Sequence, residues 1–490
     1  MSIPSDSLPQ FDELYVISDL HLGGPPGFQI FNSGAEVEKL VNALRASDPN
    51  RPDRRVALVV NGDLVDFLAE RPARHFDPAG AVDKLNRIVK DPAFAPVFRS
   101  LQKFAATRNR SLVITLGNHD VELALPWVRE HLLDLLSGGN EAARGRITLS
   151  FDGAGFLCRV GNAQVLCVHG NEVDTWNVTD HETIRRIGRD LTHGLPVQSW
   201  IPNAGTQLVI DVMNDLKGRY PFIDLLKPEM EGVIPTILAL APDQRDKVRA
   251  VAATARRLAL DKIRRATGFL GSEEEVEEAV ALPAGVVAGS FGSPSSRKVL
   301  LDETEERIRS GVDPLSLVPG DQRGEYLGMS GAVLRFFRGE DTSEVLREAL
   351  EQLRADRSFD FTAEDATFKS LDESIGGDVD FVIAGHTHLE RALRRKKGRG
   401  WYFNSGTWVR LIRLEKDVLG DRDRFRTVFD AFKAGTMDAL DQFKDLVLRR
   451  LTVAAIWTDG QGTHGELRHV GLKPSEPLFS PVPGSRFKRI

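Results

Sequence analysis

Short strand-like runs that each end in an aspartate, asparagine or histidine are the feature that most constrains the fold of this chain. The runs LYVIS, RVALVVN and SLVITLG are apolar and rich in β-branched residues, and residues 35–47 and 80–107 between them have helical periodicity. This alternation predicts a mostly parallel sheet with crossover helices. Because functional groups in such sheets gather at the carboxyl ends of strands, we expect the polar residues after these strands to lie together.

The first of these strand ends, SDLHLGG, carries Asp19 and His21 two residues apart. Residues at i and i+2 of a strand project to the same face, so the two side chains are predicted to point together beyond the strand. The spacing suits a metal site, but a solvated acid and histidine at a strand-to-loop junction would have the same spacing. The pair therefore needs support from other strand ends.

Later strand-like runs supply that support. NGDLVD, GNHD, VHGNE and GHTH each follow an apolar run, and together with the first strand end they give a set of oxygen and nitrogen donors without sulfur: Asp19, His21, Asp63, Asn118, His169, His386 and His388. Such a set suits Mn²⁺, Fe or Zn²⁺. Seven ligands are too many for one catalytic ion, so we expect two ions that share one carboxylate and hold a bridging hydroxide. Burying these groups without a cation would be costly.

Composition is that of a globular protein, since 41% of the 490 residues are apolar and 27% are charged. The formal net charge of −6 argues against binding nucleic acid through a global positive field. The first residues lack the basic and apolar regions of a signal peptide, and no apolar run is long enough to span a membrane, so we expect a cytoplasmic protein. Cys158 and Cys167 are interpreted as core residues, with a disulfide as the minor alternative.

The chain is predicted to consist of a core that is interrupted by an insertion. The first part of the core is 1–170, a helical cap is 171–377, the second part with a C-terminal helix and hairpin is 378–471, and an extended tail is 472–490. Within the cap, helical patterns occur near 178–192, 205–217, 242–267, 273–280, 301–311 and 341–356. A segment of this length between two strands that carry site residues is too long for a loop.

The ordered motifs D-x-H, G-D-x-x-D, G-N-H-D, H and G-H-x-H resemble those of the calcineurin-like metallophosphoesterase family, over residues 12–170 and 378 to 412. The resemblance implies a four-layer α/β/β/α sandwich and a dinuclear centre. One ion would be bound by Asp19, His21, Asp63 and His388. Asp63 would bridge to a second ion bound by Asn118, His169 and His386.

The resemblance also implies roles for residues beside the ligands. His119 would face the substrate and protonate the leaving alkoxide, and Asp120 would orient His119. Asp66 is expected to be a helix cap or an acid behind the ligands rather than a ligand itself. The stretch FNSGTW at 403–408 is expected to have a structural role beside the last ligand loop.

The expected activity is metal-dependent hydrolysis of phosphoric esters, with Mn²⁺ favoured and a diester favoured because a large cap could select a bulky leaving group. The substrate is expected to be a small molecule or nucleotide-like, without a stable nucleic acid partner; the oligomeric state stays open. Some features are similar to the branch that hydrolyses the pyrophosphate of UDP-diacylglucosamine, but that branch has arginine in place of His119 and a shorter insertion. A phosphomonoesterase and a nuclease are further alternatives. A non-catalytic scaffold is disfavoured because every ligand is present.

Overall fold

The computed structural model describes residues 7–46, 48–74, 76–174, 177–197, 216, 219–226, 235–236, 239–240, 341–352, 359–414, 416–443, 446–473 and 475–490. Its contacts divide the chain into two compact units. Unit 1 comprises Met1–Lys227, Asp356–Arg413 and Ala434–Ile490, and unit 2 comprises Pro228–Ala355 and Leu414–Lys433. The helices predicted near 205–217, 242–267, 273–280 and 301–311 fall almost entirely outside the described residues.

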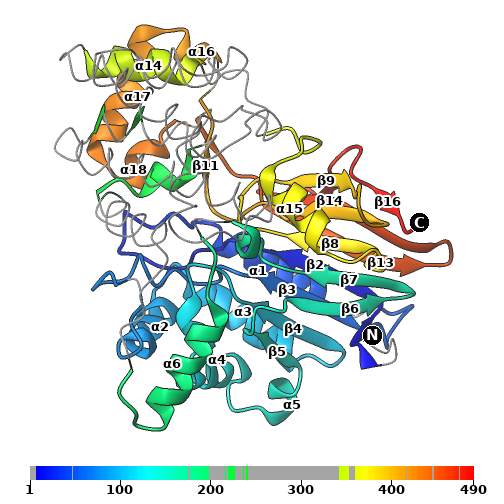
Figure 1. Ribbon diagram of the computed structural model, residues 1–490. Helices are drawn as coiled ribbons and strands as arrows, with labels where there is room; N and C mark the ends of the chain where they lie inside the picture. The colour runs from blue at the N-terminus through cyan, green and yellow to red at the C-terminus, as the bar shows by residue number, and fades with distance from the viewer. Residues whose placement is uncertain are drawn as a thin grey trace, which may run out of the picture. The chain divides into compact units, whose positions relative to one another are not determined.

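An eight-stranded sheet forms the first half of unit 1 (Figure 1). Its strands lie in the order β15-β14-β13-β2-β3-β4-β5, with β16 also paired to β14. Their bounds are β2 Glu13–Ile17, β3 Val56–Asn61, β4 Arg110–Thr115, β5 Ile147–Ser150, β13 Thr452–Asp459, β14 Gly462–Val470, β15 Phe479–Pro481 and β16 Phe487–Lys488. Strands β2 to β5 are parallel, as the alternating sequence pattern predicts, and β13 joins β2 antiparallel.

A six-stranded sheet forms the second half, in the order β1-β6-β7-β8-β10-β9. Its strands are β1 Gln10–Phe11, β6 Phe156–Val160, β7 Ala163–Cys167, β8 Phe381–Ala384, β9 Arg391–Arg394 and β10 Trp401–Asn404. Strands β7 and β8 are parallel neighbours although more than two hundred residues separate them in the sequence. The insertion is therefore part of a crossover connection between adjacent strands.

The inner faces of the two sheets enclose one apolar core. Val16 of β2, Val59 of β3, Phe381 of β8 and Ile456 of β13 are all buried in it. Cys158 and Cys167 lie in the same core as buried free cysteines, which confirms that they are core residues. Strands β2 and β3 are buried along their whole length, as expected for a sheet that is covered on both faces.

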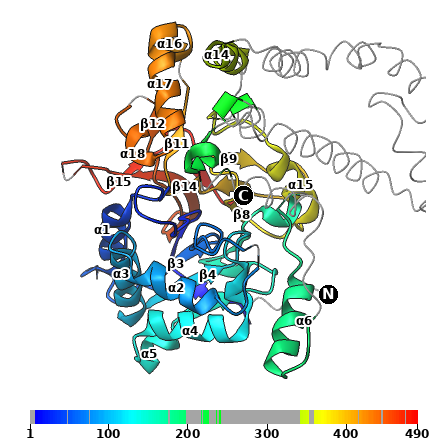
Figure 2. The same cartoon turned by 90° about the vertical axis from the view of Figure 1, so that its left-hand side faces the viewer.

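Several helices lie on the outer face of the eight-stranded sheet, and one described helix packs on that of the six-stranded sheet, which gives the layers of an α/β/β/α sandwich (Figures 1 and 2). Those beside the eight-stranded sheet are α1 Gly34–Arg45, α2 Ala81–Lys90, α3 Ala95–Ala106, α4 Pro126–Ser137 and α5 Glu141–Arg144. Helix α3 shows why these segments are helical, because Pro96 lies in its first turn and Val97, Leu101 and Phe104 make one buried stripe. Helix α15, Ala366–Ser374, packs Phe368 and Leu371 on the outer face of the six-stranded sheet.

Unit 1 also contains helix α6 His181–Thr192 and several shorter elements. These are the 3₁₀ helices Val121–Ala124, Asn171–Val173 and Pro221–Leu225, together with β11 Leu411–Ile412, α18 Met437–Leu440 and β12 Val447–Leu448. The predicted C-terminal hairpin is present as β13 and β14. Residues 479–481 and 487–488 of the extended tail form β15 and β16 against β14, so this part of the tail belongs to the sheet. In unit 2 the described helices are α14 Thr342–Gln352, α16 Lys416–Leu419 and α17 Arg422–Ala434, the last of which begins in unit 2 and ends in unit 1.

A cluster of basic residues at 394–399 lies at the turn of the β9–β10 hairpin, where side chains are commonly solvated. Arg395 is an exception, because its side chain is only 1% exposed. It pairs with Asp372 at 3.0 Å and donates to the carbonyl oxygens of Ile375, Gly376 and Val379. Arg395 therefore fastens the hairpin to the end of α15. None of the described helices is long and apolar enough to cross a membrane.

Candidate metal centre

The seven predicted ligands all follow strands, and they come from both sheets. Asp19 and His21 follow β2, Asp63 follows β3 and Asn118 follows β4, whereas His169 follows β7 and the pair His386 and His388 follows β8. Since β2, β3 and β4 are parallel, and β7 and β8 are parallel, their carboxyl ends supply loops to one end of the sandwich. The expected gathering of polar residues at strand ends is present in the structure.

The reason that Asp19 and His21 point together differs from the prediction. Strand β2 ends at Ile17, so strand alternation does not orient these residues. Both instead adopt left-handed backbone angles, with φ of 55° at Asp19 and 47° at His21. Asp63, His386 and His388 do the same, with φ between 51° and 68°. Such conformations cost about 1–3 kcal/mol each for residues other than glycine, and they concentrate where function requires them.

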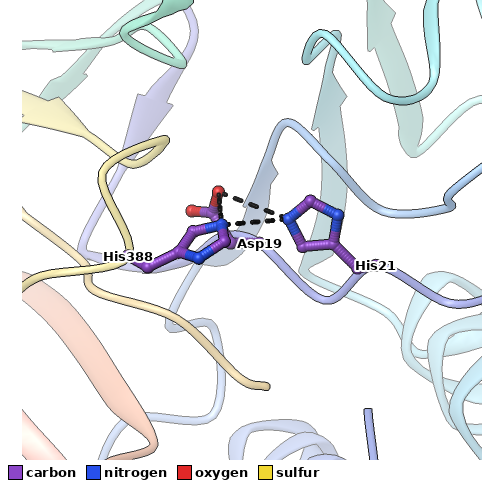
Figure 3. A group of neighbouring side chains, drawn as sticks. All are labelled: Asp19, His21 and His388. Atoms are coloured by element: carbon purple, nitrogen blue, oxygen red, sulfur yellow. Dashed lines mark hydrogen bonds and ion pairs between the residues drawn. The ribbon is translucent and has the colours of Figure 1, made fainter. Parts of the chain in front are cut away.

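Three overlapping clusters bring the side chains together. Their members are Asp19, His21 and His388; His21, Asp63 and His119; and Asp19, Asp63 and His169. Figure 3 shows the first cluster, in which the Nε2 atoms of His21 and His388 are 3.1 Å apart and Nε2 of His388 lies 3.4 Å from Oδ1 of Asp19. The side chains of this cluster are nearly inaccessible, at 9% exposure or less.

Asp63 occupies the centre of the arrangement. Its Oδ2 atom lies 3.6 Å from Nε2 of His21 and 3.1 Å from Nε2 of His169. Its Oδ1 atom accepts a hydrogen bond from the backbone N–H of His119, which fixes the carboxylate. One oxygen between two histidines from different loops is the arrangement that a bridging ligand requires.

The donor set fits divalent metal ions. Neighbouring ligands on one ion, with bonds of about 2.1 Å, are separated by about 3 Å, and the Asp63–His169 and His21–His388 distances agree with this spacing. In addition, the Oδ1 atom of Asn118 is buried and accepts no hydrogen bond from the described residues. An unsatisfied buried acceptor costs about 1–3 kcal/mol, and a cation would satisfy it.

His169 is oriented for binding through Nε2. Its Nδ1–H donates to the carbonyl oxygen of Asn61 at 2.8 Å, which directs Nε2 toward Asp63. Burial alone would lower the pKa of His169, but the carboxylates of Asp63, Asp19 and Glu172 raise it to about 10. These carboxylates thus make a buried environment that favours positive charge, as a metal site should.

His386 lies beside the clusters rather than within them. Its ring is 5.4 Å from that of His169, and its backbone N–H donates to the carboxylate of Asp19. Its Nε2 atom faces Oδ2 of Asp174 at 2.8 Å. Asp174 is not among the ligands predicted from the sequence.

His119 has Asp66, not Asp120, as its carboxylate partner, so the role expected for Asp120 needs correction. Nδ1 of His119 lies 3.1 Å from Oδ2 of Asp66, while Oδ1 of Asp66 accepts from the backbone of Leu68 and Ala69. Asp66 is therefore an acid behind the site, as expected, but its Oδ1 atom holds a turn rather than capping a helix, because residues 67–70 form a turn. Burial opposes ionisation of Asp66, but His119 and His21 hold its pKa well below the ordinary value.

Asp120 is instead a structural residue of the loops. Its two oxygens accept from the backbone N–H groups of Gly117 and Leu64, at 2.7 and 2.8 Å, which ties the loops after β3 and β4 together. Burial and the nearby charge of Asp63 raise the pKa of Asp120 to about 8. The carboxyl group faces these amides because residues 119 and 120 project in different directions, which adjacency in the sequence does not reveal.

Two glycines of the motifs are required by close approach. A Cβ atom at Gly62, where φ is 81°, would overlap the ring of His169. A Cβ atom at Gly385 would lie 2.7 Å from Oδ2 of Asp19.

The segment FNSGTW at 403–408 holds two of the ligand loops through hydrogen bonds, which is the structural role expected for it. Asn404 donates to the carbonyl oxygen of Gly385, and Thr407 and Trp408 both donate to the carbonyl oxygen of Asp19.

A two-sheet sandwich with an aspartate and histidine cluster at its strand ends defines a metal-dependent phosphoesterase. Residues 13–223 match the family model for calcineurin-like phosphoesterases, a family of dinuclear, metal-dependent hydrolases, so this part of the chain is similar to that family. The match includes the motifs as far as His169; His386 and His388 lie beyond it, and the fold brings His388 to the same cluster. No curated protein matches the chain.

Proposed function

We propose that this phosphoesterase is a phosphodiesterase that works with two divalent ions, Mn²⁺ being the favoured metal. One ion would be held by Asp19, His21, Asp63 and His388, and the other by Asp63, Asn118, His169 and His386. When bound, the ions would lower the pKa of water and polarise the phosphoryl group. The bridging role of Asp63 is supported by its contacts with both His21 and His169.

The observation that carries the proposal is the position of His119. It borders the cluster with His21 and Asp63, its side chain is 14% exposed, and Asp66 holds its Nδ1 atom. A carboxylate at Nδ1 favours a proton there and orients the ring, so that Nε2 can deliver a proton to the leaving alkoxide. An alkyl ester needs this proton because an alkoxide is a poor leaving group.

The histidine at position 119 also favours a phosphodiesterase over the main alternative, a pyrophosphatase. The pyrophosphatase branch to which the chain has some likeness carries arginine at the position of His119, and the leaving group of a pyrophosphate does not need the same protonation. A diester is preferred to a monoester because the insertion between β7 and β8 is long enough to select a bulky group beyond the phosphate.

The test compares hydrolysis of bis-nitrophenyl phosphate and nitrophenyl phosphate by the manganese-supplemented protein. We expect the diester to be hydrolysed with the higher kcat/KM. With a diester that has an alkyl leaving group, His119→Ala should lower kcat by about 10²–10⁴-fold while both ions stay bound, and the loss with bis-nitrophenyl phosphate should be smaller because nitrophenolate leaves without a proton. A preference for the monoester would contradict the diesterase assignment, and full activity of His119→Ala on the alkyl diester would contradict the role of the histidine.

Asp63→Asn tests the two-ion site separately through metal content. Loss of the bridging carboxylate should reduce the bound metal and abolish hydrolysis. A variant that keeps two ions per chain and hydrolyses at the wild-type rate would contradict a shared ligand at Asp63.

A further inference from the structure

Asp174 lies next to the proposed metal centre on the segment that follows His169. It comes directly after the short 3₁₀ turn Asn171–Val173. Its Oδ2 atom is 2.8 Å from Nε2 of His386 and accepts a hydrogen bond from Nδ2 of Asn177 at 2.7 Å. We expect His386 to bind a metal ion through Nε2, the ring nitrogen that faces Asp174.

The separation between Asp174 and His386 has the size expected for two ligands on one ion. It resembles the 3.1 Å separations of Asp63 from His169 and of His21 from His388. Ligands at about 2.1 Å from one metal and at right angles are about 3 Å apart. The carboxylate and imidazole could thus accept one ion between them with small movements.

The turn that precedes Asp174 keeps it beside the second position. Glu172 accepts hydrogen bonds from the backbone N–H groups of both His169 and Gly170, which anchors the turn to a proposed ligand. The ring of His386 is in turn 5.4 Å from that of His169. Asp174, His169 and His386 therefore lie on the same side of the centre.

The number of charged ligands on each ion gives a further argument for metal binding by Asp174. The first ion would have two carboxylates, Asp19 and Asp63, whereas the second would have only the shared Asp63 together with the neutral ligands Asn118, His169 and His386. A carboxylate from Asp174 would give each ion two. Added oxygen ligands also favour Mn²⁺ over metals that prefer nitrogen and sulfur.

We propose that Asp174 is a further ligand of the second metal ion, bound beside His386. The inference rests on the two-ion site of the proposed function. The alternative is an ion pair in which Asp174 contacts His386 without reaching the metal. The two differ in whether the side chain at residue 174 enters the coordination sphere, which can be observed without measuring activity.

The decisive experiment places a thiol at this position and uses cobalt as the probe. Asp174→Cys loaded with Co²⁺ should show a thiolate-to-cobalt charge-transfer band in the near ultraviolet, because a bound thiolate gives such a transition. The wild type has only the buried cysteines 158 and 167 and serves as the blank. Val178→Cys, whose parent side chain is 39% exposed, controls for cobalt binding at an unrelated thiol.

The possible results test metal binding by Asp174 separately from the two-ion site of the proposed function. A band in Asp174→Cys alone, which saturates with the second equivalent of cobalt, supports ligation. Two equivalents bound without the band, or with the same band in Val178→Cys, overturn the inference but leave the two-ion site. Failure of the wild type to bind cobalt or manganese would overturn the proposed metal site, and the inference with it.

A second variant keeps the inference testable if the cysteine variant does not fold. Asp174→Asn keeps the size and hydrogen-bonding ability of the side chain but removes its charge. Titration calorimetry with Mn²⁺ should show weaker binding of the second ion by about 10–100-fold and unchanged binding of the first. Unchanged affinity for both ions would overturn the inference.

Discussion

Oδ2 of Asp66 lies 3.1 Å from Nδ1 of His119, and the same carboxylate oxygen is 3.6 Å from Nδ1 of His21. Asp66 thereby connects a proposed ligand of the first ion with the proposed proton donor. Because its other oxygen is held by two backbone N–H groups, the carboxylate has little freedom to turn away. The orientation of His119 should therefore depend on Asp66.

Asp66→Asn should slow hydrolysis by about tenfold or more, because the histidine loses the charge that favours its proton. The effect should be larger for diesters with an alkyl leaving group than for those with nitrophenolate, which leaves without a proton. Rates for both kinds of ester, with metal content measured in parallel, check this. In the His119→Ala variant, adding Asp66→Asn should not lower the hydrolysis rate further. A loss of rate equal to that in the wild type would mean that Asp66 does not act through His119.

Gly62→Ala should displace His169 and destabilise the protein by about 2 kcal/mol or more, because the new methyl group overlaps the imidazole and the backbone has φ of 81°. The variant should have a lower thermal midpoint and reduced metal content. Gly376→Ala is the matched control, since a Cβ atom there meets nothing within 4 Å. Equal behaviour of the two variants would contradict the close approach at Gly62.

Arg395→Ala should destabilise unit 1 by about 3–5 kcal/mol, because it leaves the buried carboxylate of Asp372 without its cation. Lys396→Ala, one residue away, should cost less than about 1 kcal/mol, since that lysine is 63% exposed where it pairs with Glu364. Urea unfolding of the two variants measures the difference. Similar midpoints would mean that the burial of Arg395 contributes little.

Glu122 should make stability depend on pH. Burial raises the pKa of this side chain from 4.5 to about 7, so the folded state holds a proton that the unfolded state releases. The free energy of unfolding should therefore fall as pH rises from about 4.5 to about 7, by up to about 3 kcal/mol. Glu122→Gln should remove this fall, and urea unfolding of both proteins across this range tests it. Parallel pH curves would contradict a raised pKa.

Removal of metal should lower the thermal midpoint of the wild type. The proposed ions bind the folded state, and the stabilisation amounts to about 3 kcal/mol when free metal is a hundredfold above Kd. Calorimetric scans with a chelator, and again after Mn²⁺ is restored, measure the change. Asp63→Asn should show little response to the chelator, and a full response in that variant would argue against the site.

Much of the fold could be predicted because the sequence repeats one local pattern. Buried parallel strands read as apolar runs, so β2, β3, β4, β7 and β8 were recognisable, and the polar residues after them were expected to lie together. Clustering follows from sheet topology alone. The prediction that Asp19 and His21 lie together was correct, although its reason was wrong. Strand alternation does not orient the two side chains; their left-handed backbone angles do.

Pairings between side chains could not be predicted in the same way. The resemblance implied that Asp120 orients His119, yet the turn directs its carboxylate to the amides of Gly117 and Leu64. Asp66 reaches His119 from a different loop. Likewise Arg395 belongs to a cluster that resembles a solvated tip, and only the position of Asp372 on α15 explains its burial.

The pairing of β2 with β13 has a consequence for how the protein is made. Strand β2, at residues 13–17, is synthesised more than four hundred residues before its neighbour β13, at residues 452–459. Until then one edge of β2 lacks its final partner in the nascent chain, and unpaired strand edges are prone to aggregation. The first ligand loop, directly after β2, therefore follows a strand that is paired on both sides only once β13 has been translated.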